Sequence, residues 1–322
     1  MAKLKSITKK HKNLPLADNI VLKDYTIIKK ISSGGFSFVY MAKNNITNQT
    51  VAIKEYMPNS MTIRDKEDMY VHFSDDKDRS KFLNGLNHFF EEMSVISHIK
   101  HNNIINIIDY FEMNNTAYIV TPYEFGMPLS SYVSMIKSNN ATLTERDVLK
   151  IFIGILEAIE VLHENNILHL DLKPNNIWLR PNREILILDF GTAIEHNTVR
   201  DQHFFTPGYA APEQYKNHYK VLNLGAWTDY YGVGTTLYNL LSLKLPKDAI
   251  QLIKKDDGSY NNIYQECNGM WHYKILEIVD ELCQLNPDKR KKININKLIL
   301  DLKGLIPFNY IPPSLEKMLI ES

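Results

Sequence analysis

A short run of polar side chains interrupts the otherwise apolar stretch ILHLDLKPNNIWL at residues 167–179. Asp171, Lys173 and Asn176 bring a carboxylate, an ammonium group and an amide close together along the chain. Such polar clusters are usually exposed turns. A carboxylate beside a cation can also orient a hydroxyl group and stabilise negative charge, so the stretch is either a solvated turn or a reaction centre. Its unusual member is Leu170, an apolar residue directly before the carboxylate.

A second charged pair is suggested by Lys54 and Glu92. In the predicted strand VAIKEY, Ala52 and Lys54 share a face because side chains alternate along a strand. Glu92 falls on the apolar stripe of a helix predicted for residues 80–98, where a carboxylate is costly unless it is paired. Lys54 is the obvious partner, although either residue alone would be read as structural.

Two loops carry residues that suit phosphate and metal binding. The turn within ISSGGFSFVY, residues 31–40, contains Gly34, and small residues between two strands let the backbone approach phosphate groups closely. Most Gly/Ser turns are only turns, so this signal is weak by itself. In LDFG, residues 188–191, Asp189 ends an apolar strand and can hold a metal ion, while the following glycine allows a sharp bend.

The elements that must position these residues change character along the chain. Alternating apolar residues predict short strands in the first third, in the segments YTIIKKIS, FSFVYMAK, TVAIKEYM, NIINIIDYFEM and TAYIVTPY. A hinge is expected at residues 121–126, and the chain is then mainly helical. Thr144, with Asp147 three residues later, predicts a capped helix start. A short hairpin, NIWLRP followed by EILILDF, interrupts the helices.

Composition excludes several classes of protein. The chain has 322 residues, 44% of them hydrophobic and 23% charged, and a formal net charge of zero. A non-specific nucleic-acid binder normally carries a basic excess, which is absent here. Only two cysteines occur, so a disulfide framework is not expected and a reducing cytosol is the natural location. No apolar run is long enough for a membrane span, and the basic N-terminus lacks the apolar run of a secretory signal.

Taken together, the motifs resemble those of the eukaryotic-type protein kinases over about residues 25–302. The resemblance extends to TPGYAAPEQY at residues 206–215 and WTDYYGVGTTLYNLL at residues 227–241. Asp229, in this otherwise apolar helix, is expected to need backbone N–H donors. Sequence segments such as VAIKEYMPNSMTIRD most resemble those of the bacterial branch of Ser/Thr protein kinases.

The resemblance implies an α+β, bilobal protein-kinase-like fold, with an antiparallel-sheet N-lobe that contains one key helix and a mainly helical C-lobe. The expected divisions are a basic N-terminal tail at residues 1–22, the N-lobe at 23–121, the hinge and C-lobe at 122–305, and a C-terminal tail at 306–322.

The resemblance also implies roles for individual residues. Asp171 would be the catalytic base, with Lys173 and Thr206 beside it, and Asn176 and Asp189 would hold Mg²⁺. Lys54 would bind the α- and β-phosphates of ATP and pair with Glu92, and Trp178 would lie under the adenine. The expected ATP-binding set is Ile31, Gly34, Val39, Ala52, Lys54, Glu92, Thr121, Pro122, Glu124 and Trp178. Glu213 and Arg290 would form a structural ion pair.

Three departures from the family pattern stand out. Ser32 and Ser37 replace glycines that the family usually has, so the loop is expected to be stiffer or to bind ATP less tightly. Leu170 replaces an arginine that normally meets a phosphate on the activation segment. We therefore expect apolar contacts, with Phe204 or Phe205, to hold the segment, and an activity independent of segment phosphorylation, including at Thr198.

The function predicted from the sequence is an ATP-dependent Ser/Thr protein kinase that acts on protein hydroxyls. A pseudokinase binding module and a small-molecule kinase are the alternatives. The lysine, glutamate, aspartates and asparagine expected of a working kinase are all present, which disfavours the pseudokinase. TPGYAAPE, a segment that seats a peptide hydroxyl in the family, disfavours the small-molecule kinase. The expected location is the cytosol, or another cell into which the protein is delivered, and no nucleic-acid partner is expected.

Overall fold

The computed structural model describes residues 13–64, 68–75, 77–195, 205–215, 223–255, 260–267 and 269–306, without the side chains of Glu92 and Met93. The chain divides into two compact units. The first unit comprises Met1–Lys100 and Ile105–Glu124, and the second comprises His101–Ile104 and Phe125–Ser322. The boundary between the two units falls just after Glu124, whereas the boundary expected from the sequence lies between residues 121 and 122.

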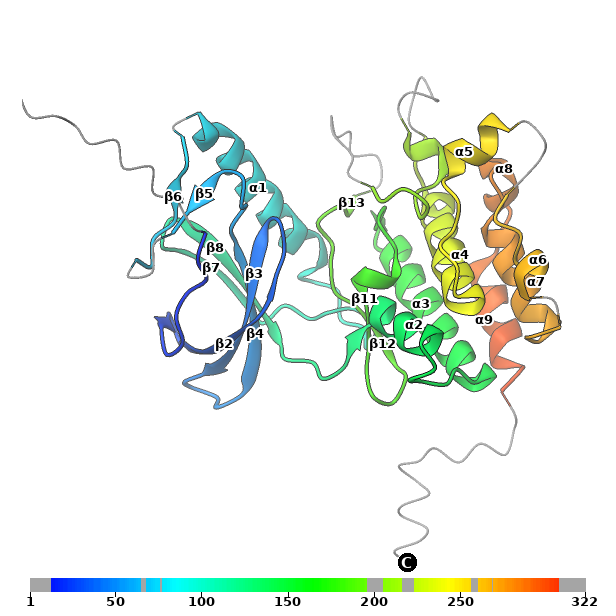
Figure 1. Cartoon of the computed structure of the whole chain (residues 1–322), viewed down its shortest axis with the longest axis horizontal. Coiled ribbons are helices and arrows are strands. Elements are labelled where there is room, and N and C mark those ends of the chain that lie inside the picture. Colours follow the sequence, from blue (N-terminus) through cyan, green and yellow to red (C-terminus); the bar gives the residue numbers. More distant parts are fainter. Residues whose placement is uncertain are drawn as a thin grey trace, which may run out of the picture. The chain divides into compact units, whose positions relative to one another are not determined.

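The first unit is built on an antiparallel sheet with the strand order β1-β2-β3-β4-β8-β7 (Figure 1). The strands are β1 (Val21–Leu22), β2 (Tyr25–Ser33), β3 (Ser37–Asn44), β4 (Thr50–Tyr56), β7 (Asp109–Met113) and β8 (Thr116–Pro122). One long helix, α1 (Asp78–Ile96), accompanies the sheet, and a short pair of strands, β5 (Thr62–Ile63) and β6 (His72–Phe73), precedes that helix.

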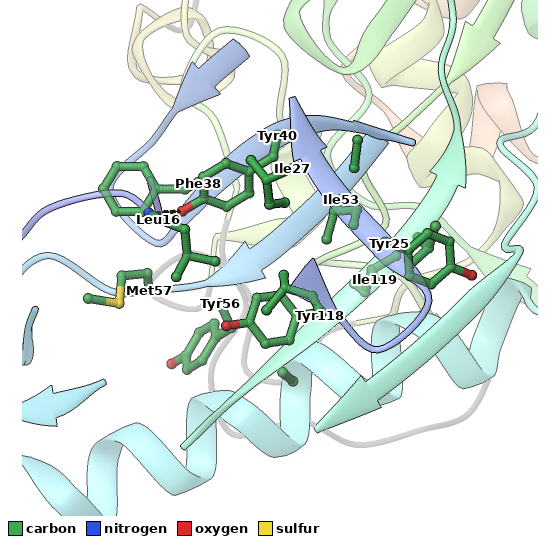
Figure 2. Close-up of a cluster of buried hydrophobic side chains, with 14 of the residues drawn as sticks. Leu16, Tyr25, Ile27, Phe38, Tyr40, Ile53, Tyr56, Met57, Tyr118 and Ile119 are labelled. Carbon is green, nitrogen blue, oxygen red and sulfur yellow. Dashed lines mark hydrogen bonds between the residues drawn. The ribbon is translucent and has the colours of Figure 1, made fainter. Parts of the chain in front are cut away.

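Side-chain alternation decides which face of this sheet is buried. Tyr40, Ile53 and Tyr118 come from three neighbouring strands, and each is fully buried. Figure 2 shows them within an apolar cluster that also takes in Leu16 and Met57. Because strand residues point alternately to the two faces, the alternate residues of β3 and β4, such as Val39, Ala52 and Lys54, lie on the opposite face and are half-buried.

A buried ion pair lies within this core. Glu55 at the end of β4 and Arg64 just after β5 contact each other with no exposed side-chain surface. The hydroxyls of Tyr40 and Tyr118 donate hydrogen bonds to Glu55 at 2.7 and 2.8 Å. Burial acts to lower the pKa of Arg64, but the hydrogen bond and charge of Glu55 outweigh it and raise this pKa. The pair joins β4 to β5 without an unpaired buried charge.

The segment before β1 packs against the first unit. Leu16 is buried, and its backbone N–H donates to the Tyr40 hydroxyl at 3.0 Å, a hydrogen bond drawn in Figure 2. Asn13 forms a β-bridge with Arg64, whose guanidinium reaches the Leu14 carbonyl at 3.4 Å. The basic N-terminal tail expected at residues 1–22 is shorter than predicted, because residues 13–22 supply both a core side chain and the edge strand β1.

The second unit is mainly helical (Figure 1). Its helices are α2 (Leu129–Lys137), α3 (Glu145–Glu164), α4 (Ala226–Ser242), α5 (Ala249–Lys254), α6 (Ile263–Cys267), α7 (Tyr273–Leu282), α8 (Pro287–Arg290) and α9 (Ile295–Lys303). The predicted cap of α3 is confirmed, because Thr144 and Asp147 exchange the two hydrogen bonds of a capping box. Within the described residues, no helix is long and apolar enough to span a bilayer.

Short strands and 3₁₀ turns in the second unit carry the chemistry-bearing residues. They are β9 (Met127–Pro128), β10 (Ile167–Leu168), η1 (Pro174–Asn176), β11 (Ile177–Leu179), β12 (Ile185–Ile187), β13 (Ile194–Glu195) and η2 (Pro212–Gln214). The strand expected at residues 103–113 is shorter than predicted and is limited to β7. Asn103 and Ile104 instead bond or bridge to Ile187, which commits their backbone to the second unit.

The predicted α+β architecture is confirmed: one unit combines an antiparallel sheet with one long helix, and the other is mainly helical.

Candidate active site

A carboxylate, an ammonium group and a hydroxyl meet just after β10 in the second unit. Lys173 Nζ lies 2.5 Å from Asp171 Oδ2 and 2.7 Å from the Thr206 hydroxyl. That hydroxyl donates to Asp171 Oδ1 at 2.7 Å. Both carboxylate oxygens are therefore engaged, and the three residues that the sequence placed in the catalytic group lie together. The cluster fixes the carboxylate in one orientation, as a group that must receive a hydroxyl requires.

Asn176, at the end of η1, is attached to the same aspartate. Its side-chain NH₂ donates to the Asp171 backbone carbonyl at 2.9 Å and to the Asp171 carboxylate at 3.3 Å. This use of the NH₂ group orients the amide and leaves Oδ1 as the atom able to bind a cation. The structure thus joins a residue of the predicted metal set to the predicted base.

Asp189 follows β12 at an exposed position, and one of its carboxylate oxygens accepts the Gly191 N–H at 3.3 Å. Asp189 and Asn176 both offer oxygen donors, which suit Mg²⁺. The described residues contain no group of three or more His, Cys, Asp or Glu able to hold a metal.

The backbone before Asp171 is held by a buried carboxylate in α4. Asp229 accepts the N–H of His169 at 2.9 Å and that of Leu170 at 2.7 Å. The Asp229 carboxylate also contacts His163 Nε2 at 2.9 Å. Burial acts to raise the pKa of Asp229, but the hydrogen bond and charge of His163 and the His169 contacts outweigh it and lower this pKa. The expectation that Asp229 would need backbone N–H donors is therefore confirmed.

Leu170 adopts a backbone conformation unusual for leucine, with φ at 65°. Its carbonyl accepts the Gln214 side-chain N–H at 2.7 Å, so Asp229 and Gln214 hold the two polar groups of its backbone. The side chain is 5% exposed and lies in an apolar cluster with Leu168, Ile194 and the half-buried Leu224.

Neither phenylalanine expected beside Leu170 is among its described apolar partners. Phe204 lies outside the described residues, and the ring of Phe205 packs against Tyr215 with centroids 4.5 Å apart. Leu168 is only two residues before Leu170, but Ile194 and Leu224 are distant in sequence, and no local pattern pointed to them.

His169 is a positioning residue that the sequence analysis did not assign. Its buried ring lies 5.2 Å from that of Phe190, and its Nδ1 accepts the Asp171 backbone N–H at 3.3 Å. Burial lowers the pKa of His169, against the raising effect of Asp229 and other carboxylates. The neutral ring keeps Nδ1 as an acceptor. Thr192 adds a hydrogen bond to the His169 carbonyl at 2.8 Å, which ties the residues after Asp189 to the same loop.

In the first unit, the predicted nucleotide residues on the central strands share one face of the sheet. Val39 on β3 lies opposite Lys54 on β4, and Ala52 lies opposite Thr121 on β8. All four are half-buried, and the residue directly before each of them is buried and points to the other face. Lys54 Nζ lies 5.7 Å from the centre of the Phe89 ring in α1. The predicted pair of Lys54 with Glu92 lies outside the description, because the Glu92 side chain is not described.

The remaining nucleotide candidates lie at strand ends. Ile31 is near the end of β2 and 40% exposed, and Gly34 follows in the loop before β3. Pro122 ends β8 opposite Val51, and Glu124 comes two residues later.

Trp178 belongs to the second unit, where it pairs with Pro128 of β9 and Leu186 of β12. Its indole N–H is buried and has no hydrogen-bond partner in the part of the chain that the structure describes.

The expected structural ion pair is present. Arg290 Nη2 lies 2.6 and 2.7 Å from the two Glu213 carboxylate oxygens, and both side chains are buried. The pair ties η2, which contains Gln214, to α8, and so supports the residue that holds the Leu170 carbonyl.

Comparison with known proteins identifies the family of the chain. The family model for the protein kinase domain matches residues 25–298. The serine/threonine-protein kinase PrkC of Bacillus subtilis is 30% identical over 229 residues, which cover 70% of this chain and 31% of that protein. The CBL-interacting serine/threonine-protein kinase 12 of Arabidopsis thaliana is 26% identical over 282 residues, 84% of this chain and 51% of that protein. The chain thus spans about a third to a half of the length of these curated relatives.

Solved structures show the same fold. The chain titled "PpkA-294 apo form" superposes with a TM-score of 0.77 at 25% identity, over 89% of this chain and 99% of that one. The PknI kinase domain of Mycobacterium tuberculosis gives a TM-score of 0.62 at 18% identity, over 90% of this chain and 99% of that one, which is a likeness of fold alone. Since the family model spans most of the sequence, the chain belongs to the protein kinase family.

Proposed function

We propose that the protein is an ATP-dependent Ser/Thr protein kinase, which transfers the γ-phosphoryl group of ATP to a protein hydroxyl. The observation that carries the proposal is the contact of Asp171 with Lys173, Thr206 and Asn176. An acceptor-orienting carboxylate, a cation and a metal-binding amide are the groups that phosphoryl transfer requires.

In this mechanism the Asp171 carboxylate accepts a hydrogen bond from the substrate hydroxyl and orients its oxygen toward phosphorus. The ammonium group of Lys173, 2.5 Å from that carboxylate, stabilises the charge of the transferring group. Asn176 and Asp189 would hold Mg²⁺, and the ion would supply positive charge to neutralise the phosphate oxygens. Lys54 binds the α- and β-phosphates. The protein contributes positioning and charge, because the transition state is loose and highly charged.

Serine and threonine are favoured over tyrosine as acceptors. The hydroxyl of Thr206 bonds to both Asp171 and Lys173. The short aliphatic hydroxyl of a substrate serine or threonine is expected to make similar contacts. The relatives named above are described as serine/threonine kinases, among them PrkC. The TPGYAAPE segment, whose η2 end is fixed by the Glu213–Arg290 pair, supports a peptide substrate over a small molecule.

We further infer that activity does not depend on phosphorylation of the activation segment. Leu170 offers no cation to a phosphate, and its side chain is already buried in an apolar cluster. Thr198, the segment threonine named from the sequence, lies outside the described residues. Phosphatase-treated protein and the Thr198→Ala variant should keep most of the wild-type rate. A drop of about a hundredfold in either would instead show that a phosphate orders the segment.

The central test compares Asp171→Asn with wild-type protein. Nucleotide affinity is measured by calorimetry in the presence of Mg²⁺, and transfer by ³²P incorporation into the kinase and a generic basic protein. Asp171→Asn should bind ATP nearly normally and lose most of the transfer. Asp189→Asn should lose Mg²⁺-dependent ATP binding as well. A wild-type protein that binds ATP but phosphorylates neither itself nor any substrate would establish the pseudokinase instead.

A further inference from the structure

The loop between β2 and β3 is held from the side by the chain that follows β4. Three consecutive loop carbonyls accept hydrogen bonds from this segment. The side-chain NH₂ of Asn59 donates to the Gly34 carbonyl at 3.1 Å, and the backbone N–H of Asn59 donates to the Gly35 carbonyl at 2.9 Å. The N–H of Met57 donates to the Phe36 carbonyl at 2.8 Å. One residue, Asn59, thus supplies two of the three hydrogen bonds.

These contacts decide which way the loop N–H groups face. In a trans peptide the carbonyl and the following N–H point in opposite directions. A Gly34 carbonyl directed at Asn59 therefore turns the Gly35 N–H away from Asn59, and the Gly35 carbonyl does the same for the Phe36 N–H. Within the described residues, neither N–H donates to a protein acceptor. Consecutive outward N–H groups form an anion-binding concavity, so the donors remain available for phosphate oxygens.

The freedom of glycine does not account for this conformation. Neither Gly34 nor Gly35 has a φ in the left-handed region, and a methyl group added to either would meet no atom within 4 Å. Other residue types could therefore adopt the same backbone. The loop carbonyls keep their direction because they are hydrogen-bonded, and the hydrogen bonds come from outside the loop.

Asn59 is itself fixed in place by its surroundings. The carbonyl of Pro58, directly before it, accepts the N–H of Met61 at 3.1 Å and the hydroxyl of the buried Thr62 at 2.8 Å. Asn13 donates its side-chain NH₂ to Asn59 Oδ1 at 2.6 Å, which leaves the Asn59 NH₂ for Gly34. The buried pair of Glu55 and Arg64 joins the two ends of this turn. The donor is thus preorganised before any ligand arrives.

We propose that Asn59 is a positioning residue for the ATP phosphates: it fixes the peptide planes of the loop so that the Gly35 and Phe36 N–H groups face the anion. The inference rests on the proposed function, since it takes ATP as the ligand. It predicts an effect restricted to ligands that carry phosphates, because Asn59 acts only through the loop carbonyls.

Two variants of Asn59 separate orientation from charge. Asn59→Ala removes both the NH₂ group that donates to the Gly34 carbonyl and the Oδ1 atom that accepts a hydrogen bond from Asn13. Asn59→Asp keeps the shape and the acceptor, but cannot donate. Asn45 provides the matched control, because it is an exposed asparagine of the same unit whose Oδ1 accepts the Thr26 hydroxyl at 2.9 Å. Asn45→Ala and Asn45→Asp repeat the same truncation and the same added charge away from the loop.

The measurement is the dissociation constant of ATP, ADP and adenosine for the full chain. Both Asn59 variants should bind ATP and ADP about fivefold more weakly, the effect of roughly one lost hydrogen bond, and adenosine as wild type does. Amide hydrogen exchange of Gly34, whose N–H donates to the Ser37 carbonyl at 2.8 Å, should quicken in both when it is measured without nucleotide. Neither Asn45 variant should change the dissociation constants or the amide exchange rate by more than a small factor.

Unchanged ATP affinity in Asn59→Ala, or an equal loss of adenosine binding, would overturn the role of Asn59. A loss confined to Asn59→Asp and abolished by salt would show charge repulsion instead of positioning. If wild-type protein binds ATP but transfers no more phosphate than Asp171→Asn does, the proposed function is wrong, whereas the role of Asn59 in ATP binding is unaffected. Wild-type protein that binds no ATP would overturn both.

Discussion

The carboxylate of Asp229 accepts the backbone N–H of Leu170 at 2.7 Å, and Leu170 holds φ at 65°. The left-handed conformation costs a leucine about 1–2 kcal/mol. A hydrogen bond to a charged acceptor contributes about 1.5–3 kcal/mol, and the same carboxylate accepts a second one from His169. Asp229 therefore more than offsets the backbone strain directly before Asp171, and links α4 to the catalytic loop.

Replacing Asp229 with asparagine should damage both stability and catalysis. An amide has one oxygen for two backbone donors, and its NH₂ group would face an N–H. The free energy of unfolding should fall by about 2–4 kcal/mol, and kcat should fall by at least about tenfold because Asp171 shifts. Urea unfolding and the ³²P assay measure the two effects. A variant with wild-type stability and kcat would mean that the loop holds its conformation without Asp229.

Substitution of Leu170 tests whether its apolar cluster stabilises the fold. Leu170→Arg puts a cation among Leu168, Ile194 and Leu224 and should lower the free energy of unfolding by about 2–4 kcal/mol. Leu170→Met keeps the volume and should cost less than about 1.5 kcal/mol. Urea denaturation of the two variants side by side gives the comparison. Equal stabilities would show that the side chain is dispensable.

The buried His169 should make stability depend on pH. Its pKa in the folded protein lies below the ordinary value of 6.5, so just below pH 6.5 the unfolded chain binds the proton and the folded chain does not. Stability due to this group is therefore present above pH 6.5 and lost as the pH falls, by up to about 1.4 kcal/mol per pH unit.

His169→Phe should remove this part of the slope. The measurement is the free energy of unfolding of wild type and variant between pH 7.5 and 5.5. The other groups close to the ring, Asp229, Asp171 and Asp189, remain in both proteins, so the difference between the two curves isolates the histidine. Parallel curves would show that His169 titrates normally in the folded state.

Trp178 should report nucleotide binding if it lies under the adenine. Stacking of adenine on an indole changes its fluorescence, so ATP should quench or shift the emission. The chain has three tryptophans, and Trp178→Leu is the necessary control. A nucleotide-induced signal that survives in Trp178→Leu would exclude this residue from the pocket. A signal that disappears while calorimetric ATP binding persists would assign it there.

Features set by short-range rules could be predicted from the sequence. Alternation placed Ala52 and Lys54 on one face of a strand, and the capping box gave the start of α3. Because burying a charge is costly, the sequence predicted that Asp229 would need backbone N–H donors, and the structure shows two of them. The motifs identified Asp171, Lys173 and Thr206, which the structure brings into contact.

Features that depend on distant segments meeting could not be predicted in this way. Leu16 looked like part of a basic tail, yet it enters the core because Tyr40 and Arg64 offer partners to its segment. Ile194 and Leu224 pack with Leu170 through tertiary contacts that no local periodicity encodes. The contacts of Asn59 could not be predicted either, since nothing in its sequence neighbourhood reveals that Gly34 and Gly35 lie beside it.

The hydrogen bonds that hold residue 170 involve its backbone, through Asp229 on one side and Gln214 on the other. No hydrogen bond of the catalytic loop depends on which side chain stands there. In evolution, an arginine and a leucine could therefore replace each other at this position while the neighbouring Asp171 keeps its position. Among the described residues, the side chains that would have to change with it are those that line it, Leu168, Ile194 and Leu224. A regulated kinase and a constitutive one would then be separated by a few side chains, with the catalytic machinery inherited intact.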